Sequence, residues 1–326
     1  MPFPAALFHF SDKKLLTNPG IWLEKSLLNS FSFFPELPPR HGQKFNTEMT
    51  MAYTLYKAPN CIRCRITHEF MDSRGIAYGA YDLEADKDIV NGFYRANRKF
   101  LHRNETGVEF PMFHDDDGDV VLQGSGVVIS YLIAGKALID SGAVSESKML
   151  HGWISGLNVS KVPAGEEDHF ADLITVLGKG GLKVVLDSDG RNSALLERLI
   201  ATGALTRIRV NIPGPASAYP LAAGGEAPSK EDLGKTIALA RGFADHVIRL
   251  YLEPIPQPDG SLAWLSPADA ALAGKMVADA CGDMLMPFGI QASAEPVKGL
   301  EPLANLLPYR SKVRAALPKT DIIKDE

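Results

Sequence analysis

The sequence predicts an α/β protein with two ordered units. From about residue 51 to 140 the pattern runs β-α-β-α-β-β-α. From about 145 to 295, strands alternate with helices of about 10–15 residues, which is typical of βα units in a parallel sheet or a partial barrel. The chain has 326 residues, which is long enough for two domains that each bury a core.

The N-terminal segment, residues 1–50, precedes the first strand. It mixes Phe and Pro without sustained helical or strand periodicity, and it lacks the cationic start and apolar run of a signal peptide. We expect either a disordered extension or a mis-assigned gene start, because Met49 and Met51 stand directly before the first strand.

Composition excludes several classes of partner. The chain is 45% apolar and 22% charged, with a net charge of -5 and a pI near 5.9, so it has no general basic field for nucleic acid. No apolar run approaches the roughly 18 residues of a membrane-spanning helix. We expect a soluble, cytoplasmic protein without nucleic-acid or membrane partners.

Cysteine usage points to redox chemistry. Only three cysteines occur, and two of them form the unit Cys61-Ile62-Arg63-Cys64. So few cysteines fit a reducing compartment better than a secreted disulfide scaffold. A structural zinc site would need four ligands and no second Cys pair exists, so we expect no metal here.

A strand leads into a helix that begins at the first of these cysteines. Residues 52–56 alternate as a short strand, and Pro59-Asn60 ends it. The helix is expected from Cys61 to Arg74, with Gly75 suited to its C-terminal cap. Cys61 is therefore predicted at a helix N-terminus.

This position predicts two different roles for the two thiols. The helix N-terminus stabilises an anion, and Arg63 and Arg65 add positive charge, so we expect a lowered pKa for Cys61. Cys61 should attack a disulfide, and Cys64 should resolve the mixed disulfide. His68 lies seven residues after Cys61, on nearly the same helical face. It could act near the dithiol, or it could be a half-buried helix residue without a role there.

The remaining elements of the first unit follow in order. A strand at 76–83 and an amphipathic helix at 86–103 come next. Strands at 108–114 and 120–123 flank an acidic turn and form a hairpin. The closing helix starts after Gly124-Ser125-Gly126.

With these motifs in place, residues 51–137 resemble the glutaredoxin family. The resemblance rests on the dithiol at the helix start, on Pro111 in the place of the family's cis-proline, and on Gly124-Ser125-Gly126 in the place of its glycine turn. It implies a thioredoxin-like fold and a thiol-disulfide oxidoreductase in which Cys61 and Cys64 are catalytic.

The resemblance also implies a substrate-binding set. A cis peptide bond after Phe110 would place the Phe110 backbone beside Cys61, whereas a trans proline at a strand edge is the alternative. The implied substrate-binding residues are Lys57, Phe110, Pro111, Gly124 and Ser125. The implied partners are a protein or small-molecule disulfide and a glutathione or thioredoxin-type electron donor. Glutathione as reductant is the one cofactor-like molecule we expect.

In the second unit, the sequence predicts five strands alternating with four helices. The strands are expected at 152–157, 182–186, 208–211, 246–252 and 284–290, and the helices at 166–178, 193–201, 230–242 and 267–281. Residues 296–326 are expected to form a C-terminal tail.

The middle strands of this unit resemble those of radical-SAM activating enzymes. The likeness lies in residues 181–190 and 207–214 and covers about 151–292. The three closely spaced cluster cysteines are missing, since only Cys281 remains, and Ser155-Gly156-Leu157-Asn158 stands where the family has its SAM-binding glycines. We therefore predict a degenerate partial barrel, retained for binding, that holds neither a cluster nor SAM.

Polar residues follow three of these predicted strands. Asp187, Asn211 and Glu253 fall at strand carboxyl ends, where ligands bind in βα proteins. Asp187 with Asp189-Gly190 also fits a plain turn. Cys281, on a helix, is expected to be a buried apolar residue.

Two functions remain open from the sequence. The first is a thiol-disulfide oxidoreductase whose second unit selects or docks a client. The second is a non-catalytic accessory or maturation factor, in which Cys61 and Cys64 bind a metal or Fe–S cluster with ligands borrowed from elsewhere and the barrel remnant docks a partner protein.

Overall fold

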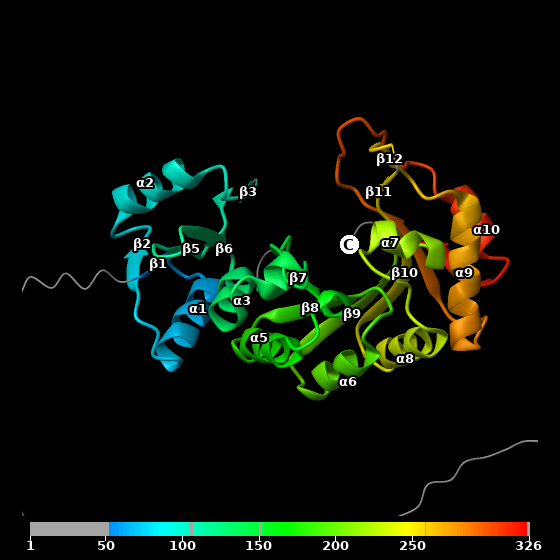
Figure 1. The fold of residues 1–326 in the computed structure, drawn as a ribbon, viewed down its shortest axis with the longest axis horizontal. Coiled ribbons are helices and arrows are strands. Elements are labelled where there is room, and N and C mark those ends of the chain that lie inside the picture. The colour runs from blue at the N-terminus through cyan, green and yellow to red at the C-terminus, as the bar shows by residue number, and fades with distance from the viewer. Residues whose placement is uncertain (1–51, 105–106, 150–151, 258, 325–326) are drawn as a thin grey trace, which may run out of the picture. The chain divides into compact units, whose positions relative to one another are not determined.

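The predicted α/β class is confirmed. The computed structural model describes residues 52–104, 107–149, 152–257 and 259–324. Within them the chain forms a mixed sheet of four strands and a parallel sheet of six (Figure 1). The expectations for residues 1–50 lie outside the described residues.

The mixed sheet has the strand order β2-β1-β5-β6. Strand β1 pairs parallel with β2 and antiparallel with β5, which forms a hairpin with β6. The elements are β1 (Tyr53–Lys57), α1 (Ile62–Ser73), β2 (Gly79–Asp82), α2 (Lys87–Asn97), β5 (Met112–Asp115), β6 (Val120–Gln123) and α3 (Ser125–Ala134).

Both faces of this sheet are covered because its central strands are apolar on both sides. Leu55 and Phe113 are cross-strand neighbours and are buried in the core that also contains side chains of α1 and α3. Their chain neighbours Tyr56 and Met112 point the other way and pack with Val90 of α2. Helices α1 and α3 thus pack on one face of the mixed sheet and α2 packs on the other.

Between α2 and β5 the structure differs from the sequence prediction. Helix α2 ends at Asn97, before Arg98-Lys99, cations that suit a helix C-terminus. A two-stranded ribbon follows, formed by β3 (Arg103–Asn104) and β4 (Gly107–Val108). The strand expected at 108–114 is divided at Pro111, which has no N–H to donate to a ladder.

The second sheet is entirely parallel, with the order β14-β13-β10-β9-β8-β7. Its strands are β7 (Trp153–Asn158), β8 (Lys183–Ser188), β9 (Leu205–Ile212), β10 (His246–Leu252), β13 (Phe288–Ala292) and β14 (Thr320–Ile322). The connecting helices are α5 (Glu167–Lys179), α6 (Ser193–Ala201), α8 (Lys230–Arg241), α9 (Pro267–Cys281) and α10 (Leu307–Val313). The predicted strand and helix succession is confirmed.

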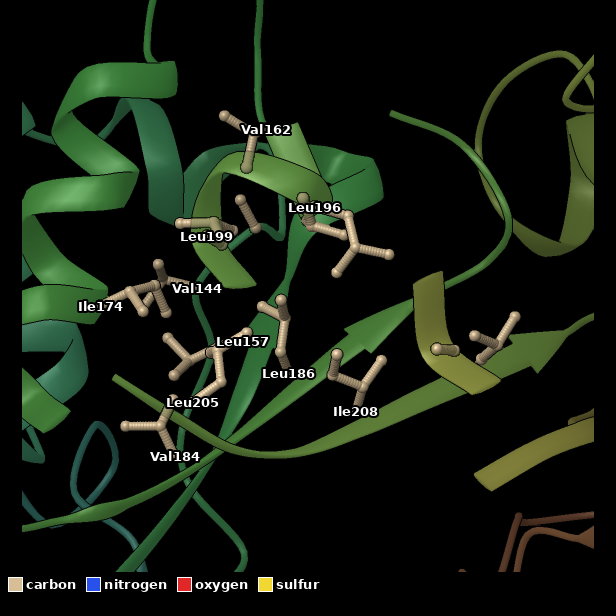
Figure 2. Packing of buried hydrophobic residues seen from close by; sticks show 14 of the residues in the cluster. Val144, Leu157, Val162, Ile174, Val184, Leu186, Leu196, Leu199, Leu205 and Ile208 are labelled. Atoms are coloured by element: carbon tan, nitrogen blue, oxygen red, sulfur yellow. The ribbon is translucent and has the colours of Figure 1, made fainter. Parts of the chain in front are cut away.

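Because neighbouring strands follow one another along the chain, right-handed connections place their helices on one face of the sheet. Figure 1 shows α5, α6 and α8 along the same side of β8 and β9. The core lies between these layers. Figure 2 shows strand residues such as Leu186 and Ile208 gathered with helix residues such as Leu196 and Leu199, all fully buried.

The C-terminal residues are part of this sheet. Residues 296–326, expected to be a tail, contain α10 and β14, and β14 pairs parallel with β13. A three-residue strand is too short to show a period in the sequence. The remaining short elements are α4 (Ala137–Asp140), η1 (Val159–Lys161), η2 (Ala216–Ala218), α7 (Tyr219–Ala222), β11 (Ile255–Pro256) and β12 (Leu262–Ala263). Within the described ranges, no helix combines the length and the apolar character needed to cross a membrane.

Helix α1 also packs against the end of α5. A Cβ added at Gly180 would lie 2.6 Å from the Ile66 side chain, so this position has room only for glycine. At the far end of α1, Arg74 donates to Asp172 of α5 at 2.5 Å. Helix α1 therefore contacts both the mixed sheet and helix α5, which packs on the parallel sheet.

Candidate functional site

Cys61 caps the N-terminus of α1, as predicted. Its backbone is extended, and the Cys64 N–H donates to the Cys61 Sγ at 3.1 Å. Asn60, with φ of 56°, forms the turn that leads into the helix. The two sulfur atoms are at disulfide-bonding distance, 2.27 Å. Cys64 is buried and Cys61 is partly exposed, so Cys61 is the more accessible of the two residues to a reactant.

The chain around Pro111 forms a wall beside the dithiol. The Phe110–Pro111 peptide bond is cis, as the glutaredoxin resemblance implies. The Phe110 carbonyl oxygen lies 3.9 Å from the Cys61 Sγ. Gly124 donates its N–H to the Pro111 carbonyl at 2.9 Å, which ties this wall to the start of α3.

An open pocket lies on the outer side of the dithiol. Its volume is about 590 Å³, and its lining residues come from β1, the turn before α1, α1 itself and the end of β2. Those with polar or reactive side chains are Lys57, Asn60, Cys61, Cys64, Arg65, His68 and Asp82. The pocket therefore brings Lys57 to the dithiol, as the sequence suggested.

Two of these lining residues were not singled out from the sequence. Asn60 belongs to the turn that positions Cys61, and Asp82 ends the strand paired with β1. The Asn60 signal was present in the Pro-Asn turn, but nothing local marks Asp82, which reaches the pocket only through strand pairing. His68 lines the pocket and is paired with Asp72 at 3.0 Å.

The two arginines near Cys61 are already paired, which corrects their expected role. The Arg63 guanidinium is buried and forms an ion pair with Glu109. Arg65 donates to the Glu69 carboxylate at 2.9 and 3.0 Å and to the Gly180 carbonyl at 2.9 Å. The spacing of four residues permits the Arg65–Glu69 pair on one helix, whereas Arg63 and Glu109 are 46 residues apart and only the fold brings them together. The helix N-terminus is thus the feature that remains to favour a Cys61 thiolate.

Gly124 and Ser125 do not line the open pocket. Ser125 is 1% exposed, and its Oγ has no hydrogen-bond partner. It borders an internal cavity of about 10 Å³, with room for about one water, together with Arg63 and Glu109. A client at Cys61 cannot touch this hydroxyl without rearrangement, so the structure places Gly124 and Ser125 apart from the other expected substrate-binding residue, Lys57, which lines the open pocket.

At the carboxyl edge of the parallel sheet, two of the three expected residues meet. Asp187 accepts two bonds from Arg209, at 2.8 and 2.7 Å, and one from the Asn211 amide at 2.8 Å. Arg249 donates to the Asn211 Oδ1 at 2.7 Å and to Gln291. The alternation Arg209-Val210-Asn211 could have placed both polar residues on one face, but their partners on β8, β10 and β13 needed the strand register.

Glu253 lies near this cluster without joining it by a described hydrogen bond. Part of its side chain reaches solvent, yet the crowding of surrounding atoms raises the pKa of Glu253. Lys161 and Lys148 oppose that shift, while Glu295 and Asp187 add to it. The structure therefore brings Asp187 and Asn211 together and leaves Glu253 at their margin.

The segment Ser155-Gly156-Leu157-Asn158, which stands where radical-SAM enzymes have their SAM-binding glycines, packs against residues of the loop that precedes β7. Ser155 is buried, and its N–H donates to the Ser147 Oγ at 3.1 Å. A Cβ at Gly156 would lie 2.6 Å from the Ser145 carbonyl oxygen. Cys281, at the end of α9, is partly buried, and burial raises its pKa to about 11. Among the described residues, no three His, Cys, Asp or Glu side chains are grouped so that they could hold a metal ion.

No family model, no curated protein and no solved structure matches the chain.

Proposed function

We propose that this chain is a thiol-disulfide oxidoreductase with a thioredoxin-like, glutaredoxin-related unit and Cys61 as its nucleophile. One observation carries the proposal: Cys61 is the partly exposed N-cap of α1, it opens onto a pocket, and a buried second thiol lies one helical turn away. An ordinary structural disulfide would need neither the helix terminus nor the pocket.

The reaction follows from these positions. The Cys61 thiolate attacks one sulfur of a client disulfide, whose S–S bond breaks and whose other sulfur leaves as a thiolate that takes up a proton. Cys64 then loses its proton and attacks the Cys61 sulfur of the mixed disulfide. The client's second thiol is released, and the Cys61–Cys64 disulfide forms. An external thiol donor, glutathione or a thioredoxin-type protein, supplies two electrons to restore the dithiol.

The surroundings of Cys61 suit an extended client. The Phe110 carbonyl, close to the Cys61 sulfur, is a hydrogen-bond acceptor for the client's backbone beside its disulfide. The ammonium group of Lys57, which lines the pocket, favours a client with an acidic group near the disulfide. We further infer that the six-stranded sheet is a partial (βα) barrel that docks the client and performs no cluster chemistry.

The test uses single cysteine variants of the full chain. Cys61→Ser is expected to reduce turnover of an insulin-type disulfide to background, whereas Cys64→Ser should accumulate a mixed disulfide visible by intact mass. Cys281→Ser is the matched control and should behave as wild type, because its thiol is partly buried at the end of α9. Near-wild-type turnover by Cys61→Ser would refute the proposal.

A further inference from the structure

Arg63 lies inside the dithiol loop, yet its side chain faces away from solvent. Only 10% of that side chain is exposed. Its guanidinium donates to Glu109, to the Ser147 Oγ at 3.2 Å, and to the carbonyl oxygens of Met149 and Trp153, the latter at 2.6 Å. One arginine thus joins the first turn of α1 to the segment that enters strand β7.

Glu109 connects the same arginine to the wall beside the dithiol. It directly precedes Phe110, whose carbonyl oxygen lies 3.9 Å from the Cys61 Sγ. The Glu109 carbonyl oxygen accepts a bond from the Gln123 amide at 2.8 Å, which fixes its backbone. Burial raises the pKa of the Glu109 carboxyl, and the Arg63 charge opposes that shift. Two opposite charges are therefore held in a poorly hydrated place, one on a residue inside the dithiol loop and the other on the residue before Phe110.

This arrangement has a consequence for the dithiol equilibrium. The disulfide form carries no charge at Cys61, whereas the reduced form carries part of a thiolate charge there. Buried charges are weakly screened, so an excess of either sign beside Cys61 changes the free energy of the reduced form more than that of the disulfide. The Arg63–Glu109 pair keeps that balance close to neutral.

We propose that Arg63 and Glu109 are positioning residues that set the reduction potential of the Cys61–Cys64 pair, with Ser147, Met149 and Trp153 holding Arg63 in place. The inference rests on the proposed function, since it concerns the same dithiol. It also gives the contact between α1 and the start of the parallel sheet a chemical role, because Ser147, Met149 and Trp153 contact the dithiol loop through one guanidinium.

The experiment measures the equilibrium between dithiol and disulfide in dithiothreitol redox buffers at pH 7.5, which needs no client. Glu109→Gln keeps the shape of the side chain but leaves the Arg63 charge unopposed, which stabilises the thiolate and favours the reduced form. We expect the equilibrium constant for reduction to rise about tenfold, equivalent to about 30 mV. Arg63→Met leaves the Glu109 carboxyl unopposed and should shift the constant in the opposite direction.

Two further variants separate charge from loosened packing. Arg74→Met removes an arginine that ties the far end of α1 to α5, away from the dithiol, and should leave the constant unchanged. The double variant Arg63→Met/Glu109→Gln should return toward wild type, because the two charge effects cancel. Should Arg63→Met fail to fold, Glu109→Gln alone still decides the sign.

The outcomes are distinct. Opposite shifts for Glu109→Gln and Arg63→Met support the proposal. Shifts in the same direction, shifts below about twofold, or an equal shift in Arg74→Met would overturn it. Wild-type protein that equilibrates normally but reduces no disulfide would refute the proposed function and leave the potential measurements valid.

Discussion

The dithiol edge of the mixed sheet and the carboxyl edge of the parallel sheet both gather polar side chains, but they do so differently. At the first, Cys61 is partly exposed at a helix N-terminus and faces a pocket. At the second, Asp187, Arg209 and Asn211 bond to one another across adjacent strands. A residue's type and its place at a strand or helix end therefore do not by themselves make a reactive site. Exposure and the partners that the fold supplies decide.

The largest effect is expected from removing the carboxylate at the centre of the hydrogen-bonded group of Asp187, Arg209 and Asn211, which we call the interlocked cluster. Asp187→Ala deletes the acceptor of the hydrogen bonds from Arg209 and Asn211. The side chain of Asp187 is only 15% exposed and that of Arg209 only 20%. Removing a mostly buried carboxylate that accepts three hydrogen bonds costs stability, so we expect the free energy of unfolding in urea to fall by about 2–3 kcal/mol. Asp168→Ala is the matched control, because its carboxylate pairs with Arg198 but is 91% exposed.

The Asp168→Ala variant should change stability by less than about 1 kcal/mol, as is usual for surface pairs. Asp187→Ala should leave disulfide turnover by the folded protein unchanged, measured well below its unfolding midpoint. A folded Asp187→Ala protein without turnover would show that this edge takes part in the reaction, and the contrast between the two regions would fall.

Much of the fold was predictable because local signals agreed with the tertiary structure. Ser266 and Pro267 open α9, and the helix expected there has the predicted bounds, because a Ser cap and a Pro in the first turn are strong N-terminal signals. The start of α1 at Cys61 followed in the same way from the Pro-Asn turn. Strand β14 was missed, since a strand of three residues is specified by its pairing with β13 and not by its own pattern.

The site was predictable where it depends on local position and not where it depends on partners. Cys61 and Cys64 were found because a dithiol at a helix start is a local feature. The burial of Arg63 could not be found, because its partners Glu109 and Trp153 lie 46 and 90 residues away along the chain. The burial of Ser125 could not be found for the same reason, since only the fold shows that it lines an internal cavity together with Arg63 and Glu109.

A smaller effect, on the pH dependence of stability, is expected for Glu253, which lies at the margin of the interlocked cluster. The crowding of surrounding atoms raises the pKa of the exposed Glu253 above its value in the unfolded chain, so ionising this carboxyl costs more in the fold. The folded state then binds the proton more tightly, and stability falls as the pH rises from about 4.3 through the raised folded pKa. Glu253→Gln should raise the melting temperature slightly at pH 7.5 and leave it unchanged near pH 3.5.

Glu197→Gln provides the comparison for this measurement, because Glu197 is an exposed carboxylate paired with Lys235. It should show no gain at pH 7.5. A lower melting temperature for Glu253→Gln at pH 7.5 would mean that Lys161 and Lys148 stabilise the carboxylate more than crowding disfavours it.

The central claim, that the helix N-terminus makes Cys61 the reactive thiol, is tested most directly by alkylating the reduced protein with iodoacetamide across a pH series and locating the label by peptide mass spectrometry. The account predicts that Cys61 is labelled first and with a midpoint below the ordinary thiol value of about 8.5. Cys64 should react slowly because it is buried, and Cys281 should react mainly after unfolding, because burial raises its pKa to about 11. Labelling of Cys64 before Cys61, or a Cys61 midpoint at or above 8.5, would contradict it.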